Sequence, residues 1–162
     1  MDHLLIKYIL REDNHVDPNF TYLTYGDSNT RKVTQIKNTL QCGSYVFFHT
    51  SYNQQEYITA YFYVEKILTK DEHSSEINSL NTDSKVDDIV IIGSRERSKI
   101  LTYPLPFDKN VIENLKSLDI DWGKVKRGEQ SELKTISDST RSHRKLTEAE
   151  KEWLINKCHN RG

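Results

Sequence analysis

Residues 42–67, CGSYVFFHTSYNQQEYITAYFYVEKI, decide the fold of this chain. Residues 45–48 form a short, strongly apolar run, and residues 57–68 form a long run of β-branched and aromatic residues. Both compositions are typical of strands buried in a β-sheet. The eight residues between them, 49–56, are polar. We therefore predict a hairpin that ends in an eight-residue polar loop.

Further elements are predicted on both sides of this hairpin. Strands are expected at residues 3–11, 20–25 and 88–93. Before the hairpin, Val33, Ile36 and Leu40 recur at intervals of three and four residues, which is the spacing of a helix with a narrow apolar face. Asp27 or Ser28 is placed to cap that helix.

Polar stretches divide the second half of the chain. Residues 69–85 are rich in charged residues and Ser, with few apolar ones, and predict a mobile surface loop. Residues 127–145 have the same character and predict a linker. A capping box at residues 147–150, TEAE, opens a last helix. We thus expect a domain over residues 1–126, and a polar linker with a C-terminal helix over residues 127–162.

The fold class follows from the order of these elements. Residues 104–106, Pro-Leu-Pro, predict a rigid connector, and Asp108 caps a helix that runs to about Leu118. Strands do not alternate regularly with helices, which argues against a doubly wound parallel sheet. We predict an α+β fold: a curved mixed β-sheet or small open barrel with a few packed helices.

Composition excludes some classes of function. The 162 residues suit one domain. With 23 basic and 24 acidic side chains the formal net charge is −1, so nucleic-acid binding would need a local basic patch. Cys42 and Cys158 are too few for a disulfide scaffold and favour a reducing cytoplasm. No apolar stretch approaches the roughly 20 residues of a membrane span, so no membrane partner is expected.

Motifs of known catalytic or cofactor sites are missing. The chain has no phosphate-binding P-loop, no G-x-S-x-G elbow and no H-E-x-x-H helix. The adjacent Cys158 and His159 lack the paired spacing of a zinc site. We therefore predict no catalytic residues, no metal and no cofactor.

The central hairpin, residues 42–67, resembles the EVE and PUA-like domains, and the related strand–loop–strand of the YTH readers of methylated RNA. Residues 88–107, DIVIIGSRERSKILTYPLPF, resemble PUA-like domains of DNA-modification and modification-dependent restriction systems. The resemblance implies a pocket that receives a base flipped out of the nucleic acid.

That pocket would hold a base by stacking on aromatic faces and by hydrogen bonds to its polar edge. The resemblance points to the hairpin loop, and aromatic residues and the predicted helix start are placed to add to it. The expected base-binding residues are Tyr22, Tyr25, Ser28, Asn29, His49, Thr50, Ser51 and Tyr52. A polar turn without a ligand is the alternative for the hairpin loop, and ordinary core packing is the alternative for the tyrosines.

Two basic clusters are candidates for phosphate contact. Arg31 and Lys32 lie at a helix N-terminus, where free N–H groups and the helix dipole favour anions. Arg95, Arg97, Ser98 and Lys99 form the denser cluster after the strand at 88–93. Solvated basic side chains are the alternative for each cluster.

The leading hypothesis is a recognition module that senses a modified or flipped base, with DNA favoured over RNA. Its expected role is the specificity domain of a restriction or defence protein, with a fused or associated nuclease or ATPase. The alternative is a hydrolase of the same fold class acting on modified nucleosides or RNA, with Thr30, Lys32 and Glu65 as its imagined catalytic groups. A protein-interaction adaptor is the third reading.

Overall fold

The computed structural model describes residues 1–10 and 13–162. Its strands are β1 His3–Lys7, β2 Thr24–Asp27, β3 Tyr45–Tyr52, β4 Gln55–Thr69, β5 Ile89–Gly93, β6 Lys99–Pro106 and β7 Arg144–Leu146. Its helices are α1 Thr30–Thr39, α2 Lys70–Asn78, α3 Lys109–Ile112, α4 Gly123–Lys126, α5 Glu132–Ser139 and α6 Glu148–Cys158, with short 3₁₀ helices η1 Asp83–Val86 and η2 Lys116–Leu118.

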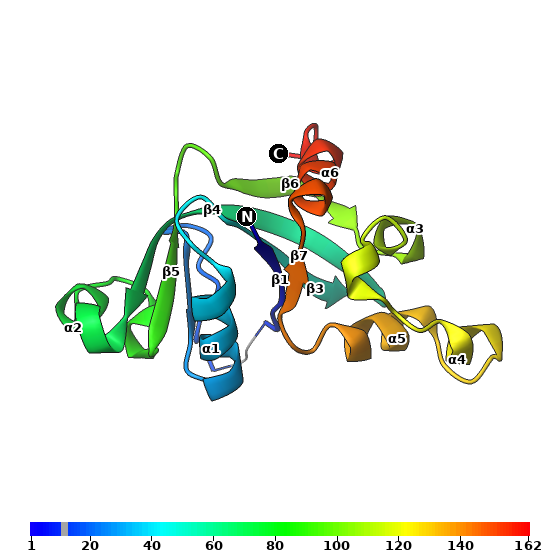
Figure 1. The fold of residues 1–162 in the computed structure, drawn as a ribbon, viewed down its shortest axis with the longest axis horizontal. Coiled ribbons are helices and arrows are strands. Elements are labelled where there is room, and N and C mark those ends of the chain that lie inside the picture. Colours follow the sequence, from blue (N-terminus) through cyan, green and yellow to red (C-terminus); the bar gives the residue numbers. More distant parts are fainter. Residues whose placement is uncertain (11–12) are drawn as a thin grey trace.

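The strands form one mixed, curved and unclosed sheet (Figure 1). Their order is β2-β5-β4-β3-β1-β7, and β6 pairs with the first half of β4. β1 runs parallel to β3, and every other pairing in the described chain is antiparallel. The predicted α+β fold with a curved mixed sheet is confirmed.

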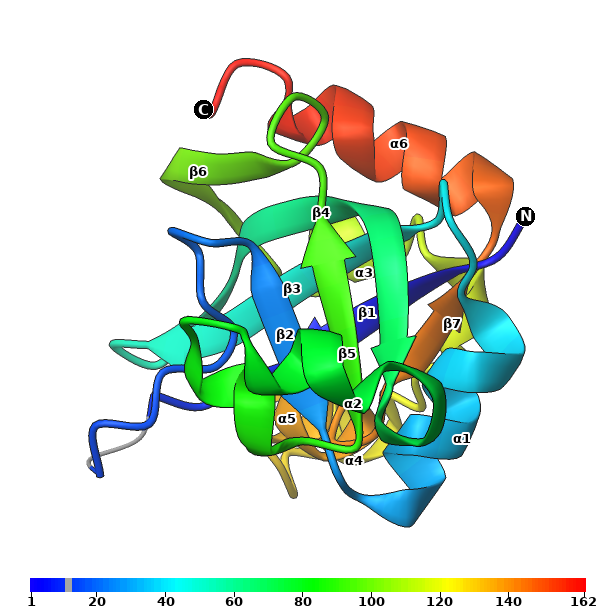
Figure 2. The ribbon, with the colours of Figure 1, turned by 90° about the vertical axis from the view of Figure 1, so that its left-hand side faces the viewer.

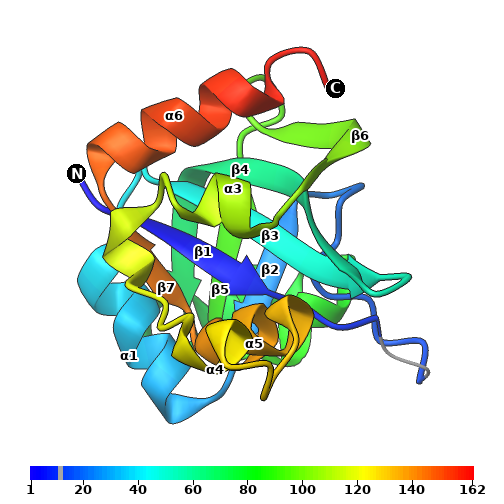
Figure 3. The ribbon, with the colours of Figure 1, turned by 90° about the vertical axis from the view of Figure 1, so that its right-hand side faces the viewer.

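The central strands are buried on both faces. Leu5 and Phe47 point into one core, which α3, α5, α6 and β6 cover (Figure 3). Their neighbours Leu4, Ile6 and Phe48 point into a second core, which is closed by β2, β5 and α1. Because side chains of a strand alternate between faces, an unbroken apolar run can supply two cores.

Strand β4 is the element that bends the sheet. Its first half pairs with β3 and β6, and its second half pairs with β5. The register shifts between Ile58 and Ala60 against β6 and between Val64 and Lys66 against β5. Such irregularities increase local twist and bend a strand. The bend carries β5 and β2 across the second core, towards the end of β1 (Figure 2).

The prediction of an eight-residue hairpin loop is wrong. β3 and β4 continue until Tyr52 pairs with Gln55, so only two residues make the turn. Those residues, Asn53 and Gln54, have φ values of 47° and 64°. A two-residue hairpin turn of this kind requires positive φ at both positions and is usually recognised by an Asn-Gly pair. The Asn-Gln pair lacks that signal, so the turn was not predicted.

Three other stretches are more ordered than predicted. Residues 69–85, expected as a mobile loop, contain α2 and η1, with Ile77 and Ser84 buried. The expected connector at 104–106 belongs to strand β6, whose prolines are tolerated because β6 is an edge strand. Residues 127–145, expected as a linker, contain helix α5 and strand β7, which pairs with β1.

Several boundaries also differ. β1 ends at Lys7, although the strand was expected to reach residue 11. Residue 11 itself lies outside the described residues. The strand expected at 20–25 begins at Thr24, because the Asn19 side chain accepts the N–H groups of Thr21 and Tyr22 in a turn. The helix expected to run to Leu118 stops after α3 and resumes as η2.

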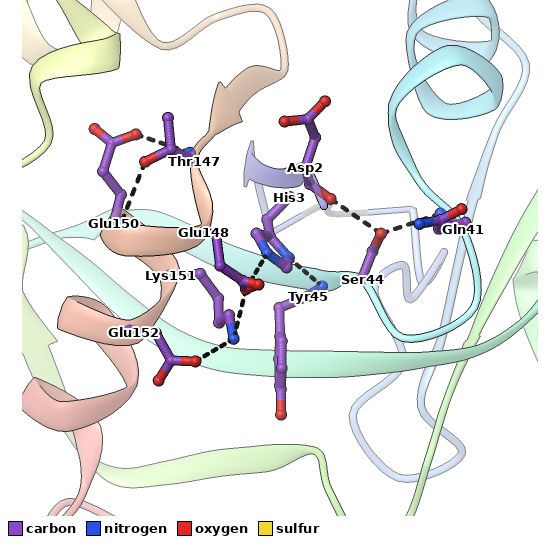
Figure 4. Close-up of polar contacts among 10 residues, drawn as sticks. All are labelled: Asp2, His3, Gln41, Ser44, Tyr45, Thr147, Glu148, Glu150, Lys151 and Glu152. Carbon is purple, nitrogen blue, oxygen red and sulfur yellow. Dashed lines mark hydrogen bonds and ion pairs between the residues drawn. The ribbon is translucent and has the colours of Figure 1, made fainter.

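The C-terminal segment is tied to the sheet by a polar network (Figure 4). The predicted capping box is confirmed: Thr147 and Glu150 exchange side-chain and backbone hydrogen bonds at the start of α6. His3 of β1 contacts Glu148 at 3.0 Å and accepts the N–H of Tyr45 at 2.8 Å. Residues from both ends of the chain therefore fix one edge of the sheet.

No helix among the described residues combines the length and the apolar character needed to cross a bilayer.

Candidate functional site

A cavity of about 400 Å³ opens where β1, β2 and α1 meet the segment before Pro18. Its volume falls within the roughly 300–1,000 Å³ that is usual for ligand pockets. The residues that line it are Lys7, Tyr8, Ile9, His15, Asp17, Tyr25, Gly26, Asp27, Lys32 and Asp87. We call it the β1–β2 cavity.

Backbone geometry brings distant carboxylates together at this cavity. The N–H of Gly26 donates to both carboxylate oxygens of Asp17, at 3.2 and 3.0 Å. Asp87 packs so close to Gly26 that a Cβ there would lie 2.3 Å from Asp87 Oδ2. Glycine at position 26 therefore admits Asp87, whereas Asp17 binds the backbone N–H of the same residue.

The two flanking acids bind protons more tightly than usual. Burial raises the pKa of Asp17 from 3.8 to about 7, and the nearby Asp87 and Asp27 carboxylates add to the rise. Burial also raises the pKa of Asp87, with Asp27 and Asp88 close by. At neutral pH, Asp17 can therefore either donate or accept a hydrogen bond.

Asp27, the third acid, is compensated. Burial would raise its pKa, but hydrogen bonds from His143, the Asn29 N–H and Tyr25 hold it below the ordinary value. The Tyr25 hydroxyl donates to Asp27 Oδ2 at 2.7 Å, and His143 Nε2 lies 3.3 Å from the same oxygen. His143 comes from the stretch before β7, so the segment expected as a linker helps to build the site.

The cavity wall is partly aromatic. Tyr8 is half-buried, packs edge-on against Phe20 and shares a hydrogen bond with Thr59 at 2.7 Å. Tyr25 is buried and packs against Phe48. Next to them Ile9 is 73% exposed, which leaves an apolar rim at the mouth. Aromatic and apolar surface beside polar groups is what a planar heterocycle requires.

Two cations and a possible metal-ligand set complete the lining. Lys7 and Lys32 reach the cavity from the end of β1 and the first turn of α1. His15, Asp17 and Asp87 each place one ligand atom within 4.8 Å of the others. His and carboxylate ligands of this type suit a divalent transition metal, and sequence spacing did not reveal the grouping.

The predicted base-binding residues are only partly brought together. Of them, Tyr25 lines the β1–β2 cavity. Asn29 caps α1 in place of the predicted Asp27 or Ser28, because its side chain accepts the N–H groups of Arg31 and Lys32. Ser28 instead donates to Asp87 at 2.9 Å, and Tyr22 is exposed in the turn before β2.

The hairpin residues occupy a different place. His49 is completely buried and its Nδ1 contacts Glu56 at 2.9 Å. Thr50, Ser51 and Tyr52 are strand residues at the end of β3, and Tyr52 is exposed. A hollow of about 80 Å³ beside the turn is well below the size of a ligand pocket. The hairpin end is thus built from paired strands and a buried His49–Glu56 contact, and base binding there stays a prediction.

The two predicted phosphate clusters lie at opposite ends of β5, because β2 runs antiparallel to it. Arg31 is exposed and Lys32 lines the cavity. In the other cluster Arg95 is exposed, but the remaining residues make internal contacts. Arg97 stacks on Tyr63, Ser98 accepts the Tyr63 N–H, and Lys99 donates to carbonyl oxygens at the end of α6.

The groups imagined for a hydrolase are not assembled either. Lys32 lines the β1–β2 cavity, whereas Thr30 lines a separate cavity with Ser28 and Lys70. Glu65 is exposed on β4. Sequence reasoning missed Lys7, Asp17 and Asp87, because their proximity arises only after the sheet has curved.

No family model matches the chain, and a search of curated proteins finds no match. Among solved structures, the chain is similar to the human THYN1 protein in complex with 5-methylcytosine-containing DNA. The TM-score is 0.50 and the identity 14%, over 100% of both chains. The chain therefore has the PUA-like fold seen in human THYN1.

Proposed function

We propose that this protein is a nucleic-acid-binding module that receives one modified base of DNA in the β1–β2 cavity. The observation that carries the proposal is the lining itself: aromatic surface from Tyr8 and Tyr25, donors from Lys7 and acceptors from Asp17 share one space of about 400 Å³. A base presents a flat apolar face and an edge of donors and acceptors, so these groups match it.

The carboxylates give the cavity a preference among bases. A carboxylate accepts well from the exocyclic amino group of cytosine or adenine. Human THYN1, which has a similar fold, is in complex with DNA that contains 5-methylcytosine. We therefore take 5-methylcytosine as the first base to test, and we expect it to enter the cavity by flipping out of the duplex.

Backbone contacts supply the rest of the affinity. Arg31 and Lys32 start α1 beside the cavity, and both can reach phosphates that flank a flipped base. Because phosphate contacts release counterions, we expect the affinity to fall steeply as salt rises.

Fluorescence titration with four ligands tests the proposal. The ligands are a duplex with one 5-methylcytosine, the same duplex with cytosine, the same duplex with an abasic site, and a matched single-stranded RNA. We expect the modified duplex to bind at least about tenfold more tightly than the abasic one, equal to about 1.4 kcal/mol. Equal affinity for all four ligands would remove base recognition.

The cellular role is also proposed. We infer a specificity domain of a cytoplasmic restriction or defence system that acts with an associated nuclease or ATPase. Support comes from the sequence resemblance of residues 88–107 and from the two free cysteines, Cys42 and Cys158. Affinity purification from the native cell should recover a nuclease or ATPase; recovery of neither would contradict this role.

One observation favours a second function. The raised pKa of Asp17, about 7, suits a general acid, so hydrolysis of a modified nucleoside at the same cavity is the second candidate. Chromatography of a nucleoside panel after incubation with the protein, with and without a chelator, decides it. Release of free base would support hydrolysis, and unchanged nucleosides would contradict it.

A further inference from the structure

A buried charged cluster lies directly behind the β1–β2 cavity. Glu56 at the start of β4 is 1% exposed, and three side chains surround its carboxylate. His49 Nδ1 lies 2.9 Å from Oε2, Ser51 donates to Oε1 at 3.2 Å, and Lys7 Nζ lies 3.3 Å from Oε1. Lys7 also donates to the Ser137 hydroxyl of α5. The cluster joins β1, β3, β4 and α5.

The charge states within the cluster follow from these contacts. Burial would raise the pKa of Glu56, but the hydrogen bond from His49 and the Lys7 ammonium hold it below its ordinary value. Burial lowers the pKa of His49, which outweighs the opposing effect of Glu56. The cluster at neutral pH is thus a carboxylate–ammonium pair, with a neutral imidazole that donates through Nδ1.

Such a cluster is a poor means of stabilising a core. A buried ion pair gains little over apolar residues of the same volume, because both ions lose their hydration. His49 adds a further penalty, since its Nε2 is buried against Phe107 without a hydrogen-bond partner among the described residues. A role beyond stability is therefore indicated.

Lys7 is the member of the cluster that belongs to the lining of the cavity. Its side chain is 13% exposed, and it lines the β1–β2 cavity. An ammonium group has three N–H donors, and the described contacts, Glu56 and Ser137, use two. The third donor has no partner among the described contacts, and the two partners hold the group in place.

We infer that Lys7 donates a hydrogen bond to an acceptor atom on the edge of the bound base, and that Glu56 is a positioning residue that fixes the Lys7 ammonium for this contact. The inference rests on the proposed function. A phosphate is the less suitable acceptor, because it would remain in solvent at the mouth while Lys7 is largely buried. An abasic duplex keeps its phosphates and loses the base edge, so it separates the two acceptors.

The test measures the affinity ratio between the 5-methylcytosine duplex and the matched abasic duplex. The proteins are the wild type, Lys7→Met, Glu56→Gln, the double variant, and Lys66→Met as a control on the exposed side of β4. We expect Lys7→Met to reduce the ratio about tenfold with abasic affinity unchanged. Lys66→Met should retain the wild-type ratio.

The double variant distinguishes positioning from a purely structural role. If Glu56 acts through Lys7, Glu56→Gln should reduce the ratio several-fold in the wild-type background and have no further effect in the Lys7→Met background. Equal, independent losses in both backgrounds would overturn the positioning role. Ser137→Ala is a milder change to the other Lys7 partner and should lower the ratio about twofold to threefold. This variant keeps the test decisive if Glu56→Gln does not fold.

The remaining outcomes are separable. A wild-type ratio of one contradicts the proposed function and the inference with it. A wild-type ratio well above one that Lys7→Met leaves unchanged overturns the inference alone. Loss of abasic affinity in Lys7→Met would assign Lys7 to phosphate and likewise overturn the base contact.

Discussion

Buried carboxylates occur in two neighbouring regions of this molecule, and their proton affinities are shifted in opposite directions. At the hairpin, Glu56 contacts His49, Ser51 and Lys7, and its pKa lies below the ordinary value. At the β1–β2 cavity, the pKa values of Asp17 and Asp87 lie above it. The hairpin acid is paired with a cation, whereas burial dominates the pKa values of the cavity acids and neighbouring carboxylates add to the rise.

Because the pKa values are shifted in opposite directions, we assign the Glu56 cluster a supporting role and the β1–β2 cavity the proposed binding role. Ionisation of a carboxylate whose pKa is lowered favours the folded state, whereas ionisation of one whose pKa is raised by burial opposes it. Proteins retain the second kind where function needs it. On the proposed function, the polar residues 49–56 include the groups that support the site, and the β1–β2 cavity is the site itself.

Removal of the hairpin acid should have the largest effect. Glu56→Ala leaves the Lys7 ammonium buried without its counter-ion, so we expect a loss of about 3–5 kcal/mol in the free energy of unfolding. Urea denaturation measures it. The double variant Lys7→Met/Glu56→Gln removes both charges and should recover most of the loss. A single variant as stable as the wild type would show that the pair is solvated.

The equivalent change in the cavity should have the opposite sign. The folded-state pKa of Asp17, about 7, exceeds its ordinary 3.8, so the folded protein binds the proton more tightly and loses stability as the pH rises from about 4 to 7. Asp17→Asn does not titrate. We expect equal stability near pH 4 and a gain of roughly 2–3 kcal/mol above pH 7. Destabilisation at pH 8 would contradict the raised pKa of Asp17.

The hydroxyl of Tyr25 should matter less. Tyr25→Phe keeps the ring in the cavity wall but removes the donor to Asp27, so we expect a loss of about 1 kcal/mol in stability. Thermal unfolding at pH 7 measures it. Tyr61→Phe is the matched control, since no described residue hydrogen-bonds to the Tyr61 hydroxyl. Equal effects of the two changes would show that the Asp27 contact adds nothing.

A change at the hairpin turn should have the smallest effect. Tyr52 is 66% exposed, and Tyr52→Ala should alter stability by no more than about 0.5 kcal/mol. DNA affinity should also stay within about twofold, because Tyr52 does not line the β1–β2 cavity. A loss of affinity above about fivefold would return the binding site to the hairpin, where sequence reasoning expected it.

The sheet was largely predictable from the sequence because its central strands carry a strong local signal. Apolar runs at 45–48 and 57–68 are buried from both faces and correspond to β3 and β4. Helix starts were also visible where a side chain caps the backbone, as at Asp108 and Thr147. Both signals are local in sequence, so they can be recognised without knowledge of the tertiary structure.

The missed elements depend on tertiary contacts. Strand β6 contains two prolines, which an edge position tolerates and sequence reasoning penalises. Helix α5 and strand β7 bury few apolar residues, chiefly Ile136 and Leu146, and are held by pairing with β1 and by packing on the core. These tertiary contacts outweigh the weak local propensity of the α5 and β7 segments.

The candidate site was less predictable than the fold. Tyr25 and Lys32, which the sequence singled out, line the β1–β2 cavity, but the other lining residues Lys7, Asp17 and Asp87 come from three separate segments. They meet because β2 pairs with β5 and because Gly26 admits Asp87. No spacing rule links residues 7, 17 and 87, so only the curved sheet could reveal their proximity.

The most direct test of the central claim is a map of backbone amide chemical shifts in the ¹⁵N-labelled protein as a duplex with one 5-methylcytosine is added. We expect the largest base-dependent changes, relative to the abasic duplex, at Lys7–Ile9, His15, Asp17, Tyr25–Asp27 and Asp87. Changes confined to the hairpin turn at 50–55, or to the basic turn at 94–98, would contradict a base-binding site in the β1–β2 cavity.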